Sequence, residues 1–122
     1  MTQRTKSLAI LMAAIPLIAL SITLLNPAHA RGDAKPQTAE VRVDNFTFGP
    51  QSLTVPVNTT VTWVNRDDIP HVIVSNDGVF KSKALDTDDS FSFTFTTAGT
   101  FDYFCSLHPH MVGKVIVKDK TS

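Results

Sequence analysis

Residues 100–111 read Thr-Phe-Asp-Tyr-Phe-Cys-Ser-Leu-His-Pro-His-Met, a run of strand-forming residues that ends in side chains able to bind a metal. Cys105 is followed by His108 after two intervening residues, and Met111 comes after two more. A thiolate, an imidazole and a thioether are ligands that copper accepts, and this spacing lets one short loop carry all three. The aromatic residues before Cys105 predict a strand that leads into the loop.

A fourth candidate ligand, His71, lies upstream and follows a turn at 67–70. One thiolate, two imidazoles and one thioether form the ligand set of a mononuclear copper site that transfers electrons. Cys105 is also the only cysteine, so the chain cannot form an internal disulfide. An inert thiol in the core is the alternative interpretation of Cys105 alone. The nearby His108 and Met111 favour a metal ligand instead.

The first thirty residues have the pattern of an export signal. Arg4 and Lys6 precede an almost wholly apolar run over 8–25, and Ala28-His29-Ala30 offers small residues for signal peptidase. We therefore predict that residues 1–30 are a cleaved signal peptide and that the protein is exported to the periplasm. An uncleaved membrane anchor is the alternative, because about 17 to 25 apolar residues can span a bilayer.

The charge composition excludes some partners. The chain has 11 Lys and Arg against 11 Asp and Glu, a formal net charge of zero. This balance provides no basic field for nucleic acid. We expect a monomer that has no contact with the membrane once the signal is cleaved. Five acids are interpreted as solvated loop charges without calcium-loop spacing: Asp67, Asp68, Asp86, Asp88 and Asp89.

The rest of the chain predicts a flexible leader over residues 31–39 and one all-β domain over 40–120. Alternating apolar residues separated by turn formers indicate several short strands, of which 90–96 is the clearest. Short strands at this spacing are typical of a sandwich or barrel. The expected core aromatic residues are Trp63, Phe91, Phe93, Phe95, Phe101 and Phe104.

Several segments of this domain resemble the cupredoxins, and most closely the amicyanin and plastocyanin branch. They are 46–55 (FTFGPQSLTV), 60–65 (TVTWVN), 67–71 (DDIPH) and 99–115 (GTFDYFCSLHPHMVGKV). The resemblance implies a Greek-key β-sandwich, or barrel, of the cupredoxin type with one copper ion that cycles between Cu(I) and Cu(II). It also implies that His71, Cys105 and His108 are equatorial ligands and that Met111 is the axial ligand.

Two residues depart from the family pattern. Val72 stands where the family usually has an asparagine whose amide ties the two ligand loops together, so that bond is expected to be missing or replaced. Leu107 stands where proline is common, and we hypothesise that its N–H donates to the Cys105 sulfur. Gly113 is expected to permit a close backbone approach beside the site.

The family role implies a periplasmic one-electron carrier between a donor dehydrogenase or cytochrome and an acceptor, and not an enzyme. His108 would be the electron port. The expected apolar docking patch around it consists of Pro70, Leu107, Pro109 and Val112.

Other interpretations stay open at this level. Copper storage or delivery would use the same ligands, although a single methionine after residue 30 argues against it. A structural zinc site would accept cysteine and histidine, but methionine is a poor zinc ligand. His110 is either an exposed loop histidine or a pH-dependent charge on the docking face.

Overall fold

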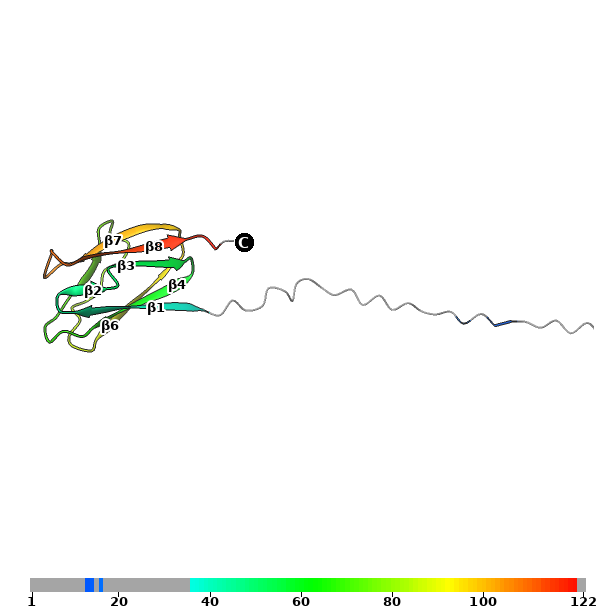
Figure 1. The fold of residues 1–122 in the computed structure, drawn as a ribbon, viewed down its shortest axis with the longest axis horizontal. Coiled ribbons are helices and arrows are strands. Elements are labelled where there is room, and N and C mark those ends of the chain that lie inside the picture. The colour runs from blue at the N-terminus through cyan, green and yellow to red at the C-terminus, as the bar shows by residue number, and fades with distance from the viewer. Residues whose placement is uncertain (1–12, 15, 17–35, 121–122) are drawn as a thin grey trace, which may run out of the picture. The chain divides into compact units, whose positions relative to one another are not determined.

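The computed structural model describes residues 13, 14, 16 and 36–120, and the domain within them consists of strands (Figure 1). The predicted signal peptide lies almost wholly outside the described residues and stays a prediction. No helix in the described part of the chain is long and apolar enough to cross a membrane. The strands are β1 (Gln37–Asp44), β2 (Thr47–Gly49), β3 (Ser52–Pro56), β4 (Thr59–Asn65), β5 (Ile73–Ser75), β6 (Ser90–Phe95), β7 (Gly99–Cys105) and β8 (Val112–Lys118).

The strands form two four-stranded sheets, with the orders β2-β1-β4-β6 and β3-β8-β7-β5. Most connections between consecutive strands cross from one sheet to the other, and the pairs β1–β4 and β3–β8 are parallel. The predicted all-β sandwich is confirmed. The predicted leader over 31–39 is too long, because β1 already begins at Gln37, which pairs with Thr59 of β4. Apolar residues are sparse at this end of β1, so the sequence alone did not mark it as a strand.

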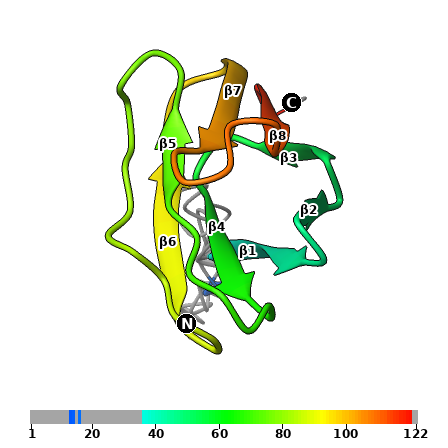
Figure 2. The same cartoon turned by 90° about the vertical axis from the view of Figure 1, so that its left-hand side faces the viewer.

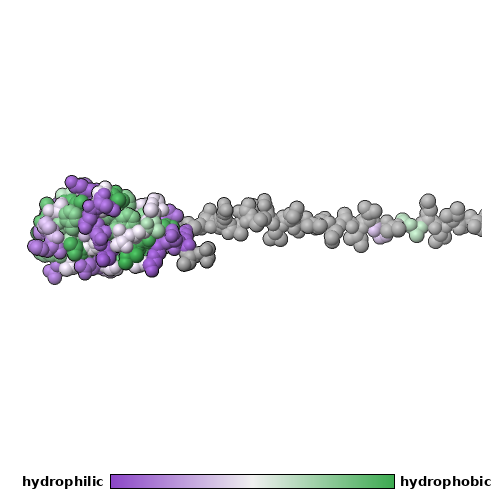
Figure 3. Space-filling model, turned by 90° about the horizontal axis from the view of Figure 1, so that it is seen from above, coloured by the Kyte–Doolittle hydropathy of each residue, from purple (hydrophilic) through white to green (hydrophobic). Residues whose placement is uncertain are grey.

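The core lies between the two sheets, where alternate residues of each strand point inward. Val41, Val43, Val61, Trp63 and Val115 are fully buried. Burial of a side chain of this size contributes about 1.5–3 kcal/mol. On the face shown in Figure 3, hydrophilic and hydrophobic residues are interspersed.

The predicted aromatic core is mostly confirmed. Trp63 and Phe95 are fully buried, and three of the other predicted residues, Phe91, Phe93 and Phe101, are partly buried against this core. Phe104 differs, because it lies between the inward-facing Tyr103 and Cys105 and is only partly buried. The two-residue period of β7 therefore puts Phe104 on the outer face of its sheet.

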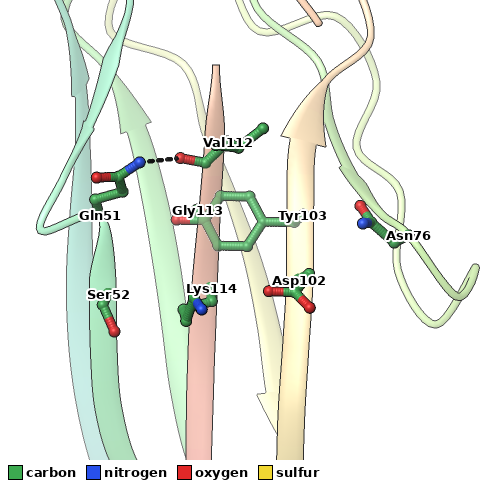
Figure 4. A pocket seen from close by; sticks show the side chains of 8 residues that line it. All are labelled: Gln51, Ser52, Asn76, Asp102, Tyr103, Val112, Gly113 and Lys114. Carbon is green, nitrogen blue, oxygen red and sulfur yellow. Dashed lines mark hydrogen bonds between the residues drawn. The ribbon is translucent and has the colours of Figure 1, made fainter. Parts of the chain in front are cut away.

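Gly113 of β8 lies opposite Tyr103 of β7, and the ring of Tyr103 lies across β8 at this glycine (Figure 4). A Cβ atom at residue 113 would lie 2.5 Å from both Cζ and the hydroxyl oxygen of Tyr103, so a side chain there would collide with the phenol group. Gly113 thus permits the close approach of an aromatic side chain, whereas the prediction was a close approach of backbone. Burial raises the pKa of Tyr103 to about 12 against a smaller opposing effect of Trp63, so the hydroxyl is protonated at neutral pH.

Candidate metal centre

Figure 2 looks onto the end of the sandwich where β7 runs into the β7–β8 loop. The segment between β4 and β5 comes to the same end, since the N–H of Ser106 donates to the carbonyl of Val72 over 3.2 Å. Cys105 is the last residue of β7, and His71 precedes β5 in a short bridge with Leu85. Strand ends from one sheet therefore bring the predicted ligands together.

The structure brings three of the four predicted ligands into one cluster. Sγ of Cys105 lies 3.6 Å from Nδ1 of His71 and 3.8 Å from Nδ1 of His108. The three candidate ligand atoms lie within 4.8 Å of one another. Metal bonds of about 2.3 Å to sulfur and 2.0 Å to nitrogen, as in zinc sites, separate these atoms by about 3.7 Å at an angle near 120°. The cluster therefore fits a single ion.

The β7–β8 loop is held by bonds within itself. The N–H of Cys105 donates to the carbonyl of Met111 over 3.0 Å, and the N–H of His108 donates to the carbonyl of Cys105 over 3.2 Å. The N–H of Met111 in turn donates to the carbonyl of His108 over 2.9 Å. Cys105 and Met111 are buried, at 0% and 5% exposure, whereas His108 is partly exposed. The loop keeps its sulfur-bearing residues from water and leaves part of the candidate ligand His108 at the surface.

The backbone of Val72 replaces the missing asparagine amide. Its carbonyl accepts the N–H of Ser106, which joins the two ligand segments without a polar side chain. Its own N–H donates to Sγ of Cys105 over 3.4 Å. Among the described residues no such bond comes from Leu107, so the hypothesis of a Leu107 donor is wrong. A donor to this sulfur stabilises the electron-rich thiolate.

The prediction that Asp67 is a solvated loop charge is wrong. Its carboxylate is buried, and Oδ2 lies 2.7 Å from Nε2 of His71. The backbone N–H groups of Asn45 and Phe46 donate to the same carboxylate over 2.6 and 3.1 Å. Burial alone raises the pKa of Asp67, but these two N–H groups and His71 together outweigh it and hold the pKa below its usual value. The group is therefore a carboxylate at neutral pH.

Phe46 is a second residue that the sequence did not indicate as part of the site. Its ring lies edge-on to His108, with centroids 5.1 Å apart, and to His71 at 6.0 Å. The side chain is 50% exposed, as is that of Leu107. The predicted patch members Pro70, Pro109 and Val112 are exposed too, as is His110. The only feature of the sequence that could have indicated Phe46 was an aromatic residue in the turn between β1 and β2.

A separate hollow lies over β3, β7 and β8, as Figure 4 shows. Its lining residues include neither a histidine nor a cysteine, and the amide of Gln51 donates there to the carbonyl of Val112 over 3.2 Å. The donor atoms for a metal gather at the Cys105 cluster instead. The hollow is lined by Gln51, Ser52, Asn76, Asp102, Tyr103, Val112, Gly113 and Lys114.

A β-sandwich with one cysteine and two histidines gathered at one end defines a class of metal-binding protein, and comparisons with known proteins identify it. Residues 14–117 match the cupredoxin-like domain family, and the chain belongs to that family. Its similarity extends to amicyanin of Paracoccus denitrificans, which is 37% identical over 83 residues, or 64% of this chain and 63% of that protein.

Two solved structures show the same relationship. The purple cupredoxin from Nitrosopumilus maritimus is 37% identical, with a TM-score of 0.62 over 66% of this chain and 99% of that one. A Cu(I) form of an amicyanin variant is 36% identical, with a TM-score of 0.63 over 66% of this chain and 82% of that one.

Proposed function

We propose that this protein carries single electrons on one copper ion held by His71, Cys105, His108 and Met111. The observation that carries the proposal is the cluster in which one buried thiol sulfur faces the Nδ1 atoms of two histidines at 3.6 and 3.8 Å. Amicyanin, to which the chain is similar, has been solved with Cu(I). The spacing of donor atoms and the relatives support the same assignment.

The donor set favours copper over other metals. A cysteine thiolate and two imidazoles suit both Cu(I) and Cu(II), and a weak methionine ligand helps to set the reduction potential. Zinc accepts the first three ligands but binds thioethers poorly. Copper in this setting supplies reversible one-electron transfer. Met111 is buried in the same loop as Cys105 and His108, which supports its role as the fourth ligand.

The way in which the chain holds its ligands favours electron transfer over substrate turnover. Cys105 ends a strand, and backbone hydrogen bonds fix its loop and join that loop to Val72. Ligands held in this way change position little between two oxidation states. Four protein ligands also leave no open position for a substrate, unlike a catalytic metal site. We infer that the protein is not an enzyme.

Electrons would enter and leave through the exposed edge of His108. Phe46 and Leu107 are each half exposed, and together with Pro70 and Pro109 they supply apolar surface near this histidine. Weak redox encounters use small interfaces that form and separate quickly. An apolar patch beside an exposed ligand suits brief contact with a donor dehydrogenase or cytochrome and with an acceptor.

The proposed location is the periplasm. Its support is the sequence of residues 1–30, in which a positive start, an apolar run and Ala28-His29-Ala30 match an export signal. The cleaved protein would act as a monomer, which suits a carrier that must diffuse between partners.

The visible absorption spectrum of the oxidised, copper-loaded protein tests this proposal. A thiolate bound to Cu(II) gives an intense charge-transfer band, which we expect in the native protein. The Cys105→Ser variant should lose the band, while the neighbouring Ser106→Ala variant should keep it. A colourless native protein that nevertheless binds stoichiometric copper would overturn the proposal.

A further inference from the structure

Asp67 is a buried acid that contacts a proposed copper ligand without belonging to the ligand set. We propose that Asp67 is a positioning residue of the copper centre: it fixes the ring of His71 and stabilises Cu(II) relative to Cu(I). The inference rests on the proposed function, because it concerns the same metal centre. Its evidence comes from the geometry of the ring, of the carboxylate and of the turn that the carboxylate holds.

The two ring nitrogens of His71 face different partners. Nδ1 lies 3.6 Å from Sγ of Cys105, on the side where the metal would bind. Nε2 lies 2.7 Å from Oδ2 of Asp67. Metal binding at Nδ1 requires the ring proton to be on Nε2, and an acceptor for that proton selects this tautomer and fixes the ring plane. His71 is fully buried, so water cannot take the place of the carboxylate.

The carboxylate is itself held in place from several sides. Its oxygens accept the N–H groups of Asn45 and Phe46, at 2.6 and 3.1 Å. The backbone of Asp67 donates to Oδ1 of Asn65 over 3.0 Å, and its carbonyl accepts the hydroxyl of Thr87 over 2.6 Å. These bonds anchor Asp67 to three other segments. The position of the carboxylate is therefore set by the fold, and the orientation of the His71 ring follows from it.

The same carboxylate stabilises an uncommon turn. Asn45 and Phe46 have φ angles of 51° and 56°, a left-handed conformation that is rare for a bulky residue such as Phe46. Asp67 accepts the N–H groups of both residues and so favours the turn. The turn places the Phe46 ring edge-on to His71 and His108. One side chain thus positions both a buried ligand and the aromatic ring beside the exposed ligand.

The negative charge of Asp67 has a consequence for the reduction potential. An anionic acceptor on Nε2 increases electron donation by the imidazole, which favours the more positive Cu(II) and lowers the midpoint potential. Asp67→Asn has nearly the same shape and keeps one oxygen acceptor, but it loses the charge. Loss of a group that orients a metal ligand typically costs about 10- to 100-fold in metal affinity. Each tenfold loss of Cu(II) affinity relative to Cu(I) raises a one-electron potential by about 59 mV.

The test compares Asp67→Asn with Asp68→Asn by redox titration of the copper-loaded proteins. Asp68 is the exposed neighbour, and its substitution removes the same charge without touching His71. We expect a clear positive shift of the midpoint potential in Asp67→Asn and a much smaller shift in Asp68→Asn. Equal shifts in the two variants would overturn the inference, because the shift would then come from the loss of one negative charge and not from the contact between Asp67 and His71.

A second measurement needs neither a variant nor copper. In the metal-free native protein, nitrogen NMR of the His71 ring at neutral pH should show a slowly exchanging proton on Nε2. A proton only on Nδ1, or one in fast exchange with water, would overturn the inference even if Asp67→Asn failed to fold. Failure of the proposed function would look different, because the native protein itself would then lack the charge-transfer band.

Discussion

The two segments that supply the proposed ligands are stabilised in different ways. The β7–β8 loop closes on itself through backbone bonds among Cys105, His108 and Met111. The segment between β4 and β5 depends on distant parts of the chain: Asn65 bonds to Leu85, and Asp67 bonds to the turn after β1. A local loop is determined by its own sequence, whereas the other segment takes its shape from the surrounding fold. The difference predicts where substitutions will be costly.

The largest expected effect follows from removing Asn65, on which the segment between β4 and β5 depends. Its Nδ2 donates to the carbonyls of Ile69 and Leu85, each over 2.8 Å, and its Oδ1 accepts the N–H of Asp67. Asn65→Ala leaves the carbonyl of Ile69 and the N–H of Asp67 without a partner, each at a cost of about 1–3 kcal/mol. The carbonyl of Leu85 loses one bond but still accepts the N–H of His71. We expect the free energy of unfolding of the metal-free protein to fall by at least about 2 kcal/mol in urea titrations.

The matched control for this prediction is Asn76→Ala. Asn76 is exposed, so its loss should change the free energy of unfolding by less than about 0.5 kcal/mol. If Asn65→Ala lost no more stability than this control, the segment between β4 and β5 would not depend on bonds to distant parts of the chain. The proposed difference between this segment and the β7–β8 loop would then be wrong.

The smallest expected effect on stability lies in the β7–β8 loop. Leu107 is half exposed and the loop is closed by its backbone, so Leu107→Ala should change the free energy of unfolding by less than about 0.5 kcal/mol. Leu107→Ala should instead weaken the encounter between two protein molecules, since the shorter side chain removes up to about 1.5 kcal/mol of apolar contact. We expect electron self-exchange, measured by NMR on mixed Cu(I) and Cu(II) protein, to slow by up to about tenfold.

Val79→Ala serves as the control, because Val79 is 46% exposed but belongs to the β5–β6 connection. It should leave self-exchange unchanged. Equal slowing in both variants would show that the docking surface is not specific to the β7–β8 loop. A large loss of stability in Leu107→Ala would show that the loop is not closed by its backbone alone.

The same contrast explains which parts of the site the sequence predicted. Cys105, His108 and Met111 were predicted because all three lie in one loop, where their spacing along the sequence indicates a set of metal ligands. His71 was found through its family pattern. Asp67 was interpreted as a solvated charge because its partner N–H groups are 22 and 21 residues away in sequence. No local sequence pattern indicates hydrogen bonds between residues so far apart. Without knowledge of its partners, a buried acid cannot be distinguished in the sequence from an exposed loop acid.

The fold was predicted to a similar extent. Alternation and turn residues predicted an all-β sandwich or barrel, since the period of a half-buried strand is visible in the sequence. The start of β1 at Gln37 was missed because it is set by pairing with Thr59, not by apolar residues. Phe104 was assigned to the core by residue type, whereas its position between two inward-facing residues puts it outside. Phe46 was missed because its place beside two histidines depends on the turn that Asp67 holds.

X-ray absorption spectroscopy of the copper-loaded protein, in both oxidation states at neutral pH, tests the central claim most directly. The claim is that two differently stabilised segments hold one ion with little change between Cu(I) and Cu(II). It predicts one sulfur neighbour at short range and two nitrogen neighbours, with nearly the same distances in both states. A copper shell without short-range sulfur, or loss of a nitrogen neighbour on reduction, would contradict it.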